Sequence, residues 1–302
     1  MRILRVLVRV CVGLGILTLG ASYLGALHPL GDSLAVFRNW IAGALLAFAV
    51  IMIFLRPRAL GVAVSVGAGI ALVGATPAEI GAMHSSEFVR PQTIYQKNLL
   101  FALPDATAIL DDIAEVSPDH MTLQEVNASN RAQVLAALPN FYARHFCPFA
   151  SVGGVAVLSR YEVVEGSEFC IEGRGMAGFQ VLSPQGPLWV VSVHLHWPYP
   201  YSQRAQVEEL TPIVAALEGP VLIGGDFNMV PWSWVMREFE RASGSRVPHP
   251  LSGTIQLFDG WFAPPIDHVI LPGRGGIQSV HPRLGSDHRA IVGMFEITEP
   301  GV

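Results

Sequence analysis

Apolar residues crowd into three stretches in the first quarter of the chain, at residues 10–31, 40–55 and 59–78. None of the three contains Asp, Glu, Lys or Arg. A membrane span needs about 20 apolar residues, so the first and third stretches are long enough. The second reaches that length only if residues 34–39 are included and Arg38 extends to the interface. The pattern predicts three transmembrane helices within residues 1–80.

A cleaved signal peptide is the alternative for the first stretch. It lacks a convincing Ala-x-Ala cleavage site and further apolar stretches follow it, so a retained helix is favoured. Arg2, Arg5 and Arg9 precede the first stretch, and Arg56 and Arg58 separate the second from the third. Basic residues mark the cytoplasmic ends of membrane helices. With three spans, the rest of the chain is predicted to lie outside the cytoplasm in a multi-pass cell-membrane protein.

The pattern after residue 92 alternates short apolar runs with helical periodicity, which predicts one α+β domain over residues 92–302. A stretch with little periodicity, residues 81–91, is predicted to be a linker. Strands are predicted at residues 96–102, 120–125, 141–146, 154–159, 162–171, 176–183, 188–195, 221–225, 266–271 and 288–297. Helices are predicted after Pro104 and at residues 130–138, 203–217 and 231–242. The strands between residues 141 and 195 follow one another, which predicts a β-meander.

The buried run Val221–Ile223 ends at two glycines, which predict a sharp turn before Asp226 and Asn228. Two residues apart, these side chains can project into one site. Such a pair suits a phosphoester, because the Asp can orient or deprotonate water while the Asn amide donates to a phosphoryl oxygen. An ordinary Gly-Asp turn is the alternative for this stretch alone. Other polar groups stand at the ends of apolar runs: Asn98, Glu125, His194, Asp267 with His268, and Asp287 with His288.

These positions form an ordered set of seven motifs: Asn98, Leu123-Gln-Glu125, Gly153-Gly-Val-Ala-Val-Leu-Ser-Arg160, Ser192-Val-His194, Gly225-Asp-Phe-Asn228, Ile266-Asp-His268 and Ser286-Asp-His288. The set resembles the endonuclease/exonuclease/phosphatase superfamily and covers nearly all of residues 92–298. With the preceding spans, the chain is similar to the bacterial membrane-anchored branch, which includes relatives of teicoplanin-resistance phosphoesterases. The resemblance implies a four-layer α/β/β/α sandwich of two mixed sheets and a metal-dependent phosphoesterase.

The resemblance also implies the role of each group. Glu125 is the first candidate ligand for Mg²⁺, with Mn²⁺ as the other possibility, because these hard ions prefer oxygen donors. Asn98 and Asp287 are expected to complete or support this metal site. Arg160 and Arg204 are candidates for binding substrate phosphates, although surface arginines are commoner.

The remaining groups are expected to carry out the reaction. His288 would lie against the phosphoryl group, with Asp267 bonded to its other ring nitrogen to favour the cation. Asp226 is the candidate for activating water, Asn228 for holding phosphoryl oxygens, and His194 for stabilising charge or protonating the leaving oxygen.

A zinc site is the rival interpretation, because His194 and His196 stand two residues apart in a strand. The other candidate ligands are carboxylates and amides, which suit Mg²⁺ or Mn²⁺ better. His268 is predicted to point to the opposite face of its strand from Asp267 and to be structural.

Charge bears on the substrate. From residue 91 onward there are 12 Lys and Arg against 21 Asp and Glu, a net charge of −9, and no basic run. Nucleic-acid enzymes draw much of their affinity from basic residues, so nucleic acid is disfavoured. A phosphorylated small molecule or lipid at the bilayer surface is favoured. The alternatives are a DNase-like extracytoplasmic nuclease and a catalytically inactive membrane scaffold, and the sequence gives no indication of oligomeric state.

Two further groups are predicted with alternatives. Trp197, Tyr199, Tyr201, Trp232 and Trp234 form either an aromatic rim near the site or part of the core. Outside the membrane helices the chain has two cysteines, Cys147 and Cys170, which are either joined as a disulfide or present as two buried thiols.

Overall fold

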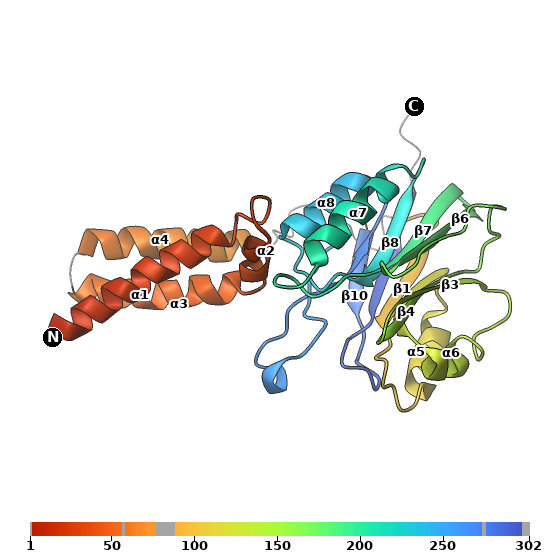
Figure 1. Cartoon of the computed structure of the whole chain (residues 1–302), viewed down its shortest axis with the longest axis horizontal. Coiled ribbons are helices and arrows are strands. Elements are labelled where there is room, and N and C mark those ends of the chain that lie inside the picture. Colours follow the sequence, from red (N-terminus) through yellow and green to blue (C-terminus); the bar gives the residue numbers. More distant parts are fainter. Residues whose placement is uncertain (1, 56–57, 76–87, 274–275, 298–302) are drawn as a thin grey trace.

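A bundle of helices forms the first quarter of the chain. The computed structural model describes residues 2–55, 58–75, 88–273 and 276–297. Its first four elements are α1 (Arg2–Ala21), α2 (Pro29–Val36), α3 (Arg38–Leu55) and α4 (Arg58–Ala75). In Figure 1, α1, α3 and α4 run side by side as an elongated bundle, and the short α2 lies where the bundle meets the rest of the molecule.

The membrane prediction is supported for two of these helices. Both α1 and α3 are long and apolar enough to cross a bilayer, whereas the apolar part of α4, Arg58–Leu72, is shorter. Three spans are therefore not established by length and composition. Most of the linker predicted at residues 81–91 lies outside the described residues. Of the part that is described, Arg90 donates its backbone N–H to the carboxylate of Glu296 at 3.0 Å.

The boundaries of the first span were predicted too late in the sequence. The helix begins at Arg2 and ends at Ala21, and α2 is separate from it. Pro29 accounts for the start of α2, because proline is favoured in the first turn of a helix. The side chain of Arg38 packs within the protein. It is buried, donates from Nε to Ser22 Oγ at 3.1 Å, and lies 3.9 Å from the centre of the Tyr23 ring.

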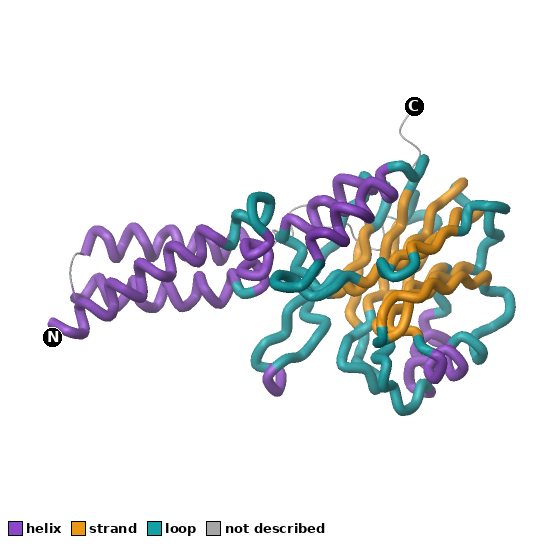
Figure 2. The backbone as a smooth tube through the Cα atoms, viewed as in Figure 1, coloured by secondary structure: helices purple, strands orange, loops and turns teal. Residues whose placement is uncertain are grey.

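Two mixed β-sheets form the remainder, so the α+β class and the pair of sheets are confirmed (Figure 2). The first sheet has the strand order β10-β11-β1-β2-β4-β3 and the second has the order β5-β6-β7-β8-β9. The strands of the first sheet are β1 (Gln92–Asn98), β2 (His120–Val126), β3 (Ala143–Ala150), β4 (Gly153–Ser159), β10 (Gly276–Val280) and β11 (Ile291–Phe295). Those of the second are β5 (Phe169–Ile171), β6 (Met176–Ser183), β7 (Gly186–His194), β8 (Val221–Asp226) and β9 (Asp267–Ile270).

Among the described strands, each sheet contains one parallel pair, and the other neighbours are antiparallel. Strands β1 and β2 are parallel in the first sheet, and β7 and β8 are parallel in the second. A parallel pair needs a crossover, which is supplied by α5 (Thr107–Val116) in the first sheet and α7 (Gln203–Ala215) in the second. The carboxyl ends of these two pairs are therefore open to carry functional side chains.

Three apolar layers hold the sandwich together. One packs α5 and α6 (Ala128–Val134) on the outer face of the first sheet, and another packs α7 and α8 (Trp234–Ser243) on the second. The third lies between the sheets and includes Ile94, Val157, Phe179 and Leu222. The order of layers is helix, sheet, sheet, helix, as the resemblance implies.

The predicted β-meander is wrong, because its strands divide between the two sheets. Strand β4 pairs with β2 and β3, while β6 pairs with β5 and β7. The strand predicted at residues 162–171 is interrupted: Val163 forms a bridge to Val181 of β6, Gly166 turns the chain with φ of 76°, and only Phe169–Ile171 forms a strand. Strand β10 was not predicted at all.

A disulfide joins Cys147 of β3 to Cys170 of β5. Each strand lies at the edge of its own sheet. The bond therefore ties the two sheets together at one side of the sandwich, which decides between the two states predicted for these cysteines. Cys11, in α1, is free.

Candidate functional site

The predicted polar side chains gather at the carboxyl ends of the two parallel strand pairs. Asn98 is the last residue of β1 and Glu125 is the second-last of β2, while His194 and Asp226 end β7 and β8. Strands β1 and β2 lie against β8 and β7 across the sandwich. Side chains from both sheets thus meet at one edge.

The two glycines before Asp226 have a different role from the predicted turn. Gly224 and Gly225 lie within β8, and neither has a positive φ. A Cβ on Gly224 would come within 2.2 Å of Thr122 Oγ1 in the facing sheet. A Cβ on Gly225 would come within 2.2 Å of the Val193 carbonyl oxygen. The glycines therefore allow close packing beneath the site, and Asp226 stands directly at the strand end.

Irregular backbone aims Glu125 into the site. The pairing of β2 with β4 shifts between Leu123 and Val126, and Glu125 has φ of 55°, a left-handed conformation that is strained for a non-glycine residue. Gly153 makes room for this bulge, because a Cβ there would lie 2.8 Å from the Glu125 carbonyl carbon. Asn228 has a similar φ of 49°. Such strain gathers at functional sites.

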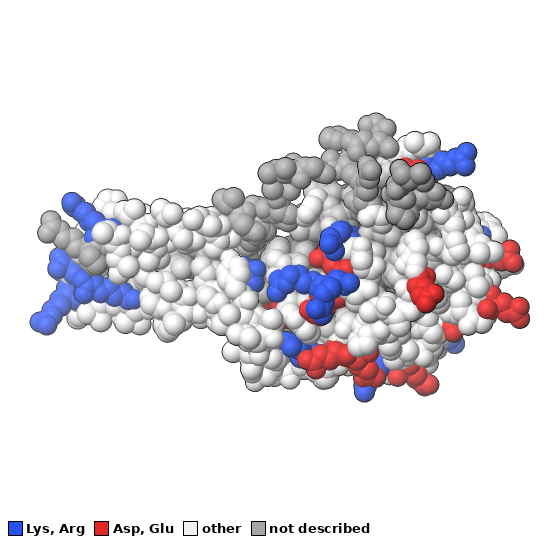
Figure 3. All heavy atoms as spheres, turned by 90° about the horizontal axis from the view of Figure 1, so that it is seen from above, with Lys and Arg blue, Asp and Glu red and all other residues white. Residues whose placement is uncertain are grey.

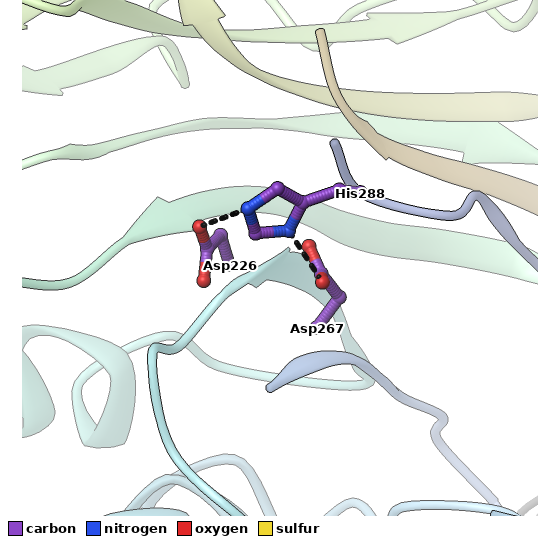
Figure 4. Close-up of side chains that lie close together, drawn as sticks. All are labelled: Asp226, Asp267 and His288. Carbon is purple, nitrogen blue, oxygen red and sulfur yellow. Dashed lines mark hydrogen bonds and ion pairs between the residues drawn. The ribbon is translucent and has the colours of Figure 1, made fainter. Parts of the chain in front are cut away.

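Strand register places three groups in a row. His194 is opposite Asp226, and Asp226 is opposite Asp267 in β9. His288, which lies between β10 and β11 in the sequence, stands between Asp226 and Asp267 (Figure 4). Its Nδ1 is 2.7 Å from Asp267 Oδ2, and its Nε2 is 3.8 Å from Asp226 Oδ2. The imidazole therefore stands between two carboxylates.

This arrangement favours a positive charge on His288. Burial opposes the imidazolium, but the carboxylates of Asp267 and Asp226 together outweigh it and raise the pKa of His288 to about 10. Burial also opposes the charge on Asp267, yet contact with His288 holds the pKa of that carboxyl below its usual value. Burial and the neighbouring charge of Asp267 raise the pKa of Asp226 to about 7. A carboxylate with a pKa near neutrality is suited to accept a proton from water.

The second imidazole of the site, that of His194, is in the opposite charge state. Burial and the positive charge of His288 lower the pKa of His194 to about 3, so this ring is neutral. Its Nε2 lies 3.6 Å from Asp226 Oδ2, and its buried Nδ1 has no partner among the described residues. His194 can therefore exchange a hydrogen bond with a ligand, while His288 supplies charge. Two histidines held in different states are typical of a division of roles.

Asn98 connects the carboxylates. Its Nδ2 donates to Asp226 Oδ2 at 3.0 Å and to Glu125 Oε1 at 3.2 Å, while its Oδ1 accepts from the Leu100 N–H at 3.0 Å. The amide therefore presents donors to the site, whereas a metal ligand would present its oxygen. The structure makes Asn98 a support for the carboxylates. The other oxygen of Glu125 accepts from the Phe101 N–H at 2.7 Å.

A cavity of about 440 Å³ opens over these groups. Its lining includes the site residues Glu125, His194, Asp226, Asn228, Asp287 and His288. One amide hydrogen of Asn228 donates to the Leu195 carbonyl at 2.8 Å, which leaves the other for a ligand. Among the described residues, those lining this cavity include three carboxylates and neither Lys nor Arg.

The donor set suits a divalent cation. Glu125 and Asp287 are close enough that the charge of Asp287 contributes, after burial, to raising the pKa of Glu125. Ligand atoms of Asp226, Asp267 and His288 also lie within 4.8 Å of one another, but Asp267 is already paired with His288. Glu125 and Asp287 have no such cationic partner at contact distance among the described residues, and their oxygens are the donors that Mg²⁺ prefers. His196 is not part of the described cluster of possible metal ligands, which gives the zinc interpretation no support.

Both predicted phosphate-binding arginines lie elsewhere. Arg160 follows the far end of β4, where it donates to the Ser117 carbonyl at 2.7 Å and pairs with Asp119 at 3.4 Å. Arg204 lies over the Trp234 ring and donates to the Gly25 carbonyl at 2.9 Å. The prediction failed because an arginine reaches whatever acceptors the fold brings near it.

Structural residues of the site were missed or only partly anticipated. Gln96 donates to Asp267 Oδ1 at 3.2 Å and to Gln124 at 2.8 Å. Lys97 donates to the His288 carbonyl at 2.6 Å, and thereby holds the loop that carries this imidazole. The signal that could have identified Gln96 and Lys97 was the presence of polar residues inside a predicted strand. His268 is structural as expected, since its Nε2 is bonded to the Met229 carbonyl at 2.7 Å.

Comparison with known proteins agrees with this geometry. Residues 96–288 match the family model described as "Endonuclease/Exonuclease/phosphatase family". No curated protein matches the sequence. The structure is similar to an endonuclease/exonuclease/phosphatase family protein from Leptotrichia buccalis C-1013-b, with a TM-score of 0.54, 14% identity, and coverage of 68% of this chain and 100% of that one.

Two further structures have the same fold. Truncated TDP2 from Caenorhabditis elegans has a TM-score of 0.53 at 19% identity, with coverage of 68% of this chain and 97% of that one. The endonuclease domain of TRAS1, a telomere-specific non-LTR retrotransposon, has a TM-score of 0.51 at 14% identity, with coverage of 70% and 100%. At such low identity these likenesses define the fold and leave the substrate undefined.

Proposed function

The chain belongs to the endonuclease/exonuclease/phosphatase family, and from this premise we propose that it is an Mg²⁺-dependent phosphoesterase that acts on a lipid-linked phosphate at a membrane surface. The coarse activity follows from the family, whose members are metal-dependent hydrolases of phosphoric esters. The ion, the substrate and the location are our proposal. The bond hydrolysed is a phosphomonoester, a phosphodiester or a pyrophosphate.

The composition of the cavity is the observation that carries this proposal. A phosphoryl group is an anion, yet the described lining provides three carboxylates and no Lys or Arg. Glu125 and Asp287 would hold Mg²⁺, with Mn²⁺ as the other candidate, and Asn98 would orient Glu125. The ion, when held by these residues, would supply the positive charge that offsets the charge of the phosphoryl oxygens.

The residues of the chain then divide the chemistry. Asp226 accepts the proton of the attacking water, because its pKa is raised to about 7. His288, held as a cation by Asp267, stabilises negative charge on the phosphoryl oxygens. Asn228 and neutral His194 contribute hydrogen bonds from the same cavity.

The surface of the helical bundle supports a membrane location. Beyond Arg9, most outward-facing residues of α1 are apolar, and Leu14 and Leu17 are 58% and 69% exposed. The two sheets with their helices are called the catalytic domain below. Figure 3 shows an uncharged belt along the bundle and basic side chains at the end farthest from the catalytic domain. An apolar belt that runs along the bundle is suited to contact with lipid. Basic residues at the far end favour a cytoplasmic position for that end and the opposite side for the catalytic domain.

Two further observations support the extracytoplasmic side and a substrate other than nucleic acid. The disulfide between Cys147 and Cys170 suits an oxidising compartment. The net charge of −9 after residue 90 opposes the approach of a polyanion. The likeness to an endonuclease domain keeps a nuclease as the alternative on fold alone, and an inactive scaffold is the other.

A substrate panel tests the proposal. Full-length protein in lipid nanodiscs is assayed with Mg²⁺ against lipid phosphates, lipid pyrophosphates, phosphodiesters, inositol phosphates and DNA. We expect lipid phosphates or pyrophosphates to give the highest kcat/KM and a chelator to abolish turnover. Glu125→Gln should reduce kcat by about 100-fold with the fold intact, while Glu115→Gln, an exposed control on α5, should not.

The outcomes separate the alternatives. Efficient DNA cleavage without turnover of any membrane-borne phosphate would favour the nuclease. A folded protein that is inert on every phosphoester would favour the scaffold. An unchanged rate and metal requirement in Glu125→Gln would remove Glu125 from the metal site.

A further inference from the structure

A second cavity lies between α2 and the cavity of about 440 Å³ over the candidate site, which we call the catalytic cavity. It has a volume of about 230 Å³ and a mainly apolar lining. Ser33 and Val36 of α2 and Phe37 line one side, and Pro264 and Ile266 line another. Trp197, Tyr201 and Asn228 line this cavity and the catalytic cavity as well. The two cavities are therefore adjacent and share a wall that includes a residue of the site.

Several contacts fix α2 against the catalytic domain. Asp32 Oδ1 accepts the Trp234 N–H at 2.8 Å, and Trp232 Nε1 donates to the Ala35 carbonyl at 2.8 Å. Ser33 Oγ donates to the Tyr199 carbonyl at 2.8 Å. The cavity is therefore bounded by fixed elements, and its position relative to the site is defined.

The outer end of this cavity faces the helical bundle. Phe37 stacks on Phe262 with ring centres 5.1 Å apart, and Trp40 of α3 lies 6.2 Å from the same ring. Phe258 and Trp261, in the loop between α8 and β9, are 75% and 81% exposed. Figure 1 shows this loop extending beside the end of the bundle where α2 lies. Exposed aromatic side chains at such a boundary are typical of contact with the bilayer interface.

We propose that this cavity, which we call the chain pocket, binds the apolar chain of a phosphorylated lipid whose headgroup occupies the catalytic cavity. The inference rests on the proposed function and specifies its substrate class. An apolar chain can pass from the bilayer, beside Phe37 and Phe262, to Trp197 and Tyr201, without leaving apolar surroundings. The phosphate then lies next to Asn228 and the carboxylates.

The chain pocket also explains the aromatic residues after β7. Trp197 and Tyr201 are 47% and 65% exposed, so they form a rim and are not core residues. Their position between the two cavities suits contact with the first carbons of the chain next to the phosphate. Burial of each methylene contributes about 0.8 kcal/mol to binding, which is about a fourfold gain in affinity.

The test uses soluble alkyl phosphonates with two to eight carbons, which cannot be hydrolysed. Their binding to full-length protein in nanodiscs with Mg²⁺ is measured by calorimetry. We expect Kd to fall about fourfold per methylene until the pocket is filled. Val36→Trp, which fills the pocket, should reduce the octyl-to-ethyl affinity ratio by about tenfold or more.

Leu30→Trp is the matched control. It adds the same ring to α2 at a residue that is 45% exposed and lies outside the pocket lining, so the ratio should stay as in the unsubstituted protein. Ser33→Leu fills the pocket with less bulk and serves if Val36→Trp does not fold. Partition of long chains into the nanodisc affects all variants equally.

Binding and turnover are read separately. If the protein hydrolyses phosphoesters but the octyl-to-ethyl ratio of phosphonate affinities is the same in Val36→Trp, Ser33→Leu and Leu30→Trp, the chain pocket is overturned. The proposed function would still stand. Absence of hydrolysis would remove the proposed function, while the phosphonate series would still decide whether the pocket binds a chain.

Discussion

The catalytic domain and the helical bundle depart from the pattern of a soluble protein in opposite ways. The catalytic domain buries polar side chains, including Lys97, Asn98 and Asp267, each at most 1% exposed. The bundle exposes apolar ones, such as Phe54 at 81% and Ile70 at 67%. Buried polar groups require partners, and exposed apolar surface requires a covering. On the proposed function, the polar cavity of one region would hold a polar ligand, and the exposed apolar surface of the other would contact lipid.

The two regions meet at α2, where both features occur together. Asp32 is buried and bonded to the catalytic domain, while Leu30 on the same helix is 45% exposed. The contact places an apolar cavity next to a polar one. The comparison therefore predicts opposite responses to charge, since a lost charge harms the catalytic domain and an added charge harms the bundle.

The largest expected effect is the loss of the buried cation in the catalytic domain. His288→Gln should lower kcat by about 10³-fold, because it removes the positive charge between Asp267 and Asp226. Steady-state kinetics on the best substrate of the panel measures it.

His281→Gln provides the control. His281 forms a similar pair with Asp112, at 2.8 Å, outside the residues that line the catalytic cavity. Its substitution should leave kcat within about twofold, as expected of a change away from the site. Equal losses in both variants would mean that His288 is structural.

An added charge on the bundle should have the next largest effect. Leu14 faces outward near the middle of α1, so Leu14→Arg should cost about 3 kcal/mol if this face contacts lipid. The fraction of protein recovered in membranes measures it. Leu182→Arg, at a residue 50% exposed in the catalytic domain, is the control and should have little effect. Undiminished membrane recovery of Leu14→Arg would contradict lipid contact along this face.

The sequence predicted most of the site because its members stand at strand ends. His194 and Asp226 each end a strand, where the apolar run stops and a polar residue is easily recognised. Asn98 also ends a strand, but that strand is largely polar and was predicted at residues 96–102, so Asn98 was recognised only from the ordered motif set. Asp267 begins β9, which runs antiparallel to β8, and so reaches the same edge. Local pattern and order along the chain were sufficient for these positions.

Contacts across the fold were not predictable in the same way. The atoms of Asn98 that face the carboxylates depend on the Leu100 N–H, which fixes the amide. Arg204 contacts Gly25, far away in the sequence, and no local pattern indicates this. The two glycines before Asp226 leave room for Thr122 and Val193 in neighbouring strands. Their role could therefore not be predicted without knowing how the strands pack.

The smallest predicted effect concerns a buried histidine outside the site. His120 is fully buried, with Nε2 2.9 Å from Gln92 Oε1 and Nδ1 3.0 Å from Ser159 Oγ. Both ring nitrogens thus have protein partners, whereas His194 lines the catalytic cavity and its buried Nδ1 has no partner among the described residues. The contrast distinguishes a structural buried histidine from one available to a ligand.

Burial lowers the pKa of His120 to about 3, from an ordinary value of 6.5. Between these values the unfolded chain binds a proton that the folded chain does not, so the free energy of unfolding falls as the pH decreases. This contribution is complete above pH 6.5 and is lost on acidification by up to about 1.4 kcal/mol per pH unit. His120→Gln removes it. Urea unfolding at pH 7.5 sets the baseline cost of the substitution, and the cost should shrink as the pH is lowered toward 4.5, because the glutamine has no proton to gain. A cost that stays constant over this range would mean that His120 gains its proton without opposing the fold, and burial with two partners would no longer separate structural histidines from those of the site.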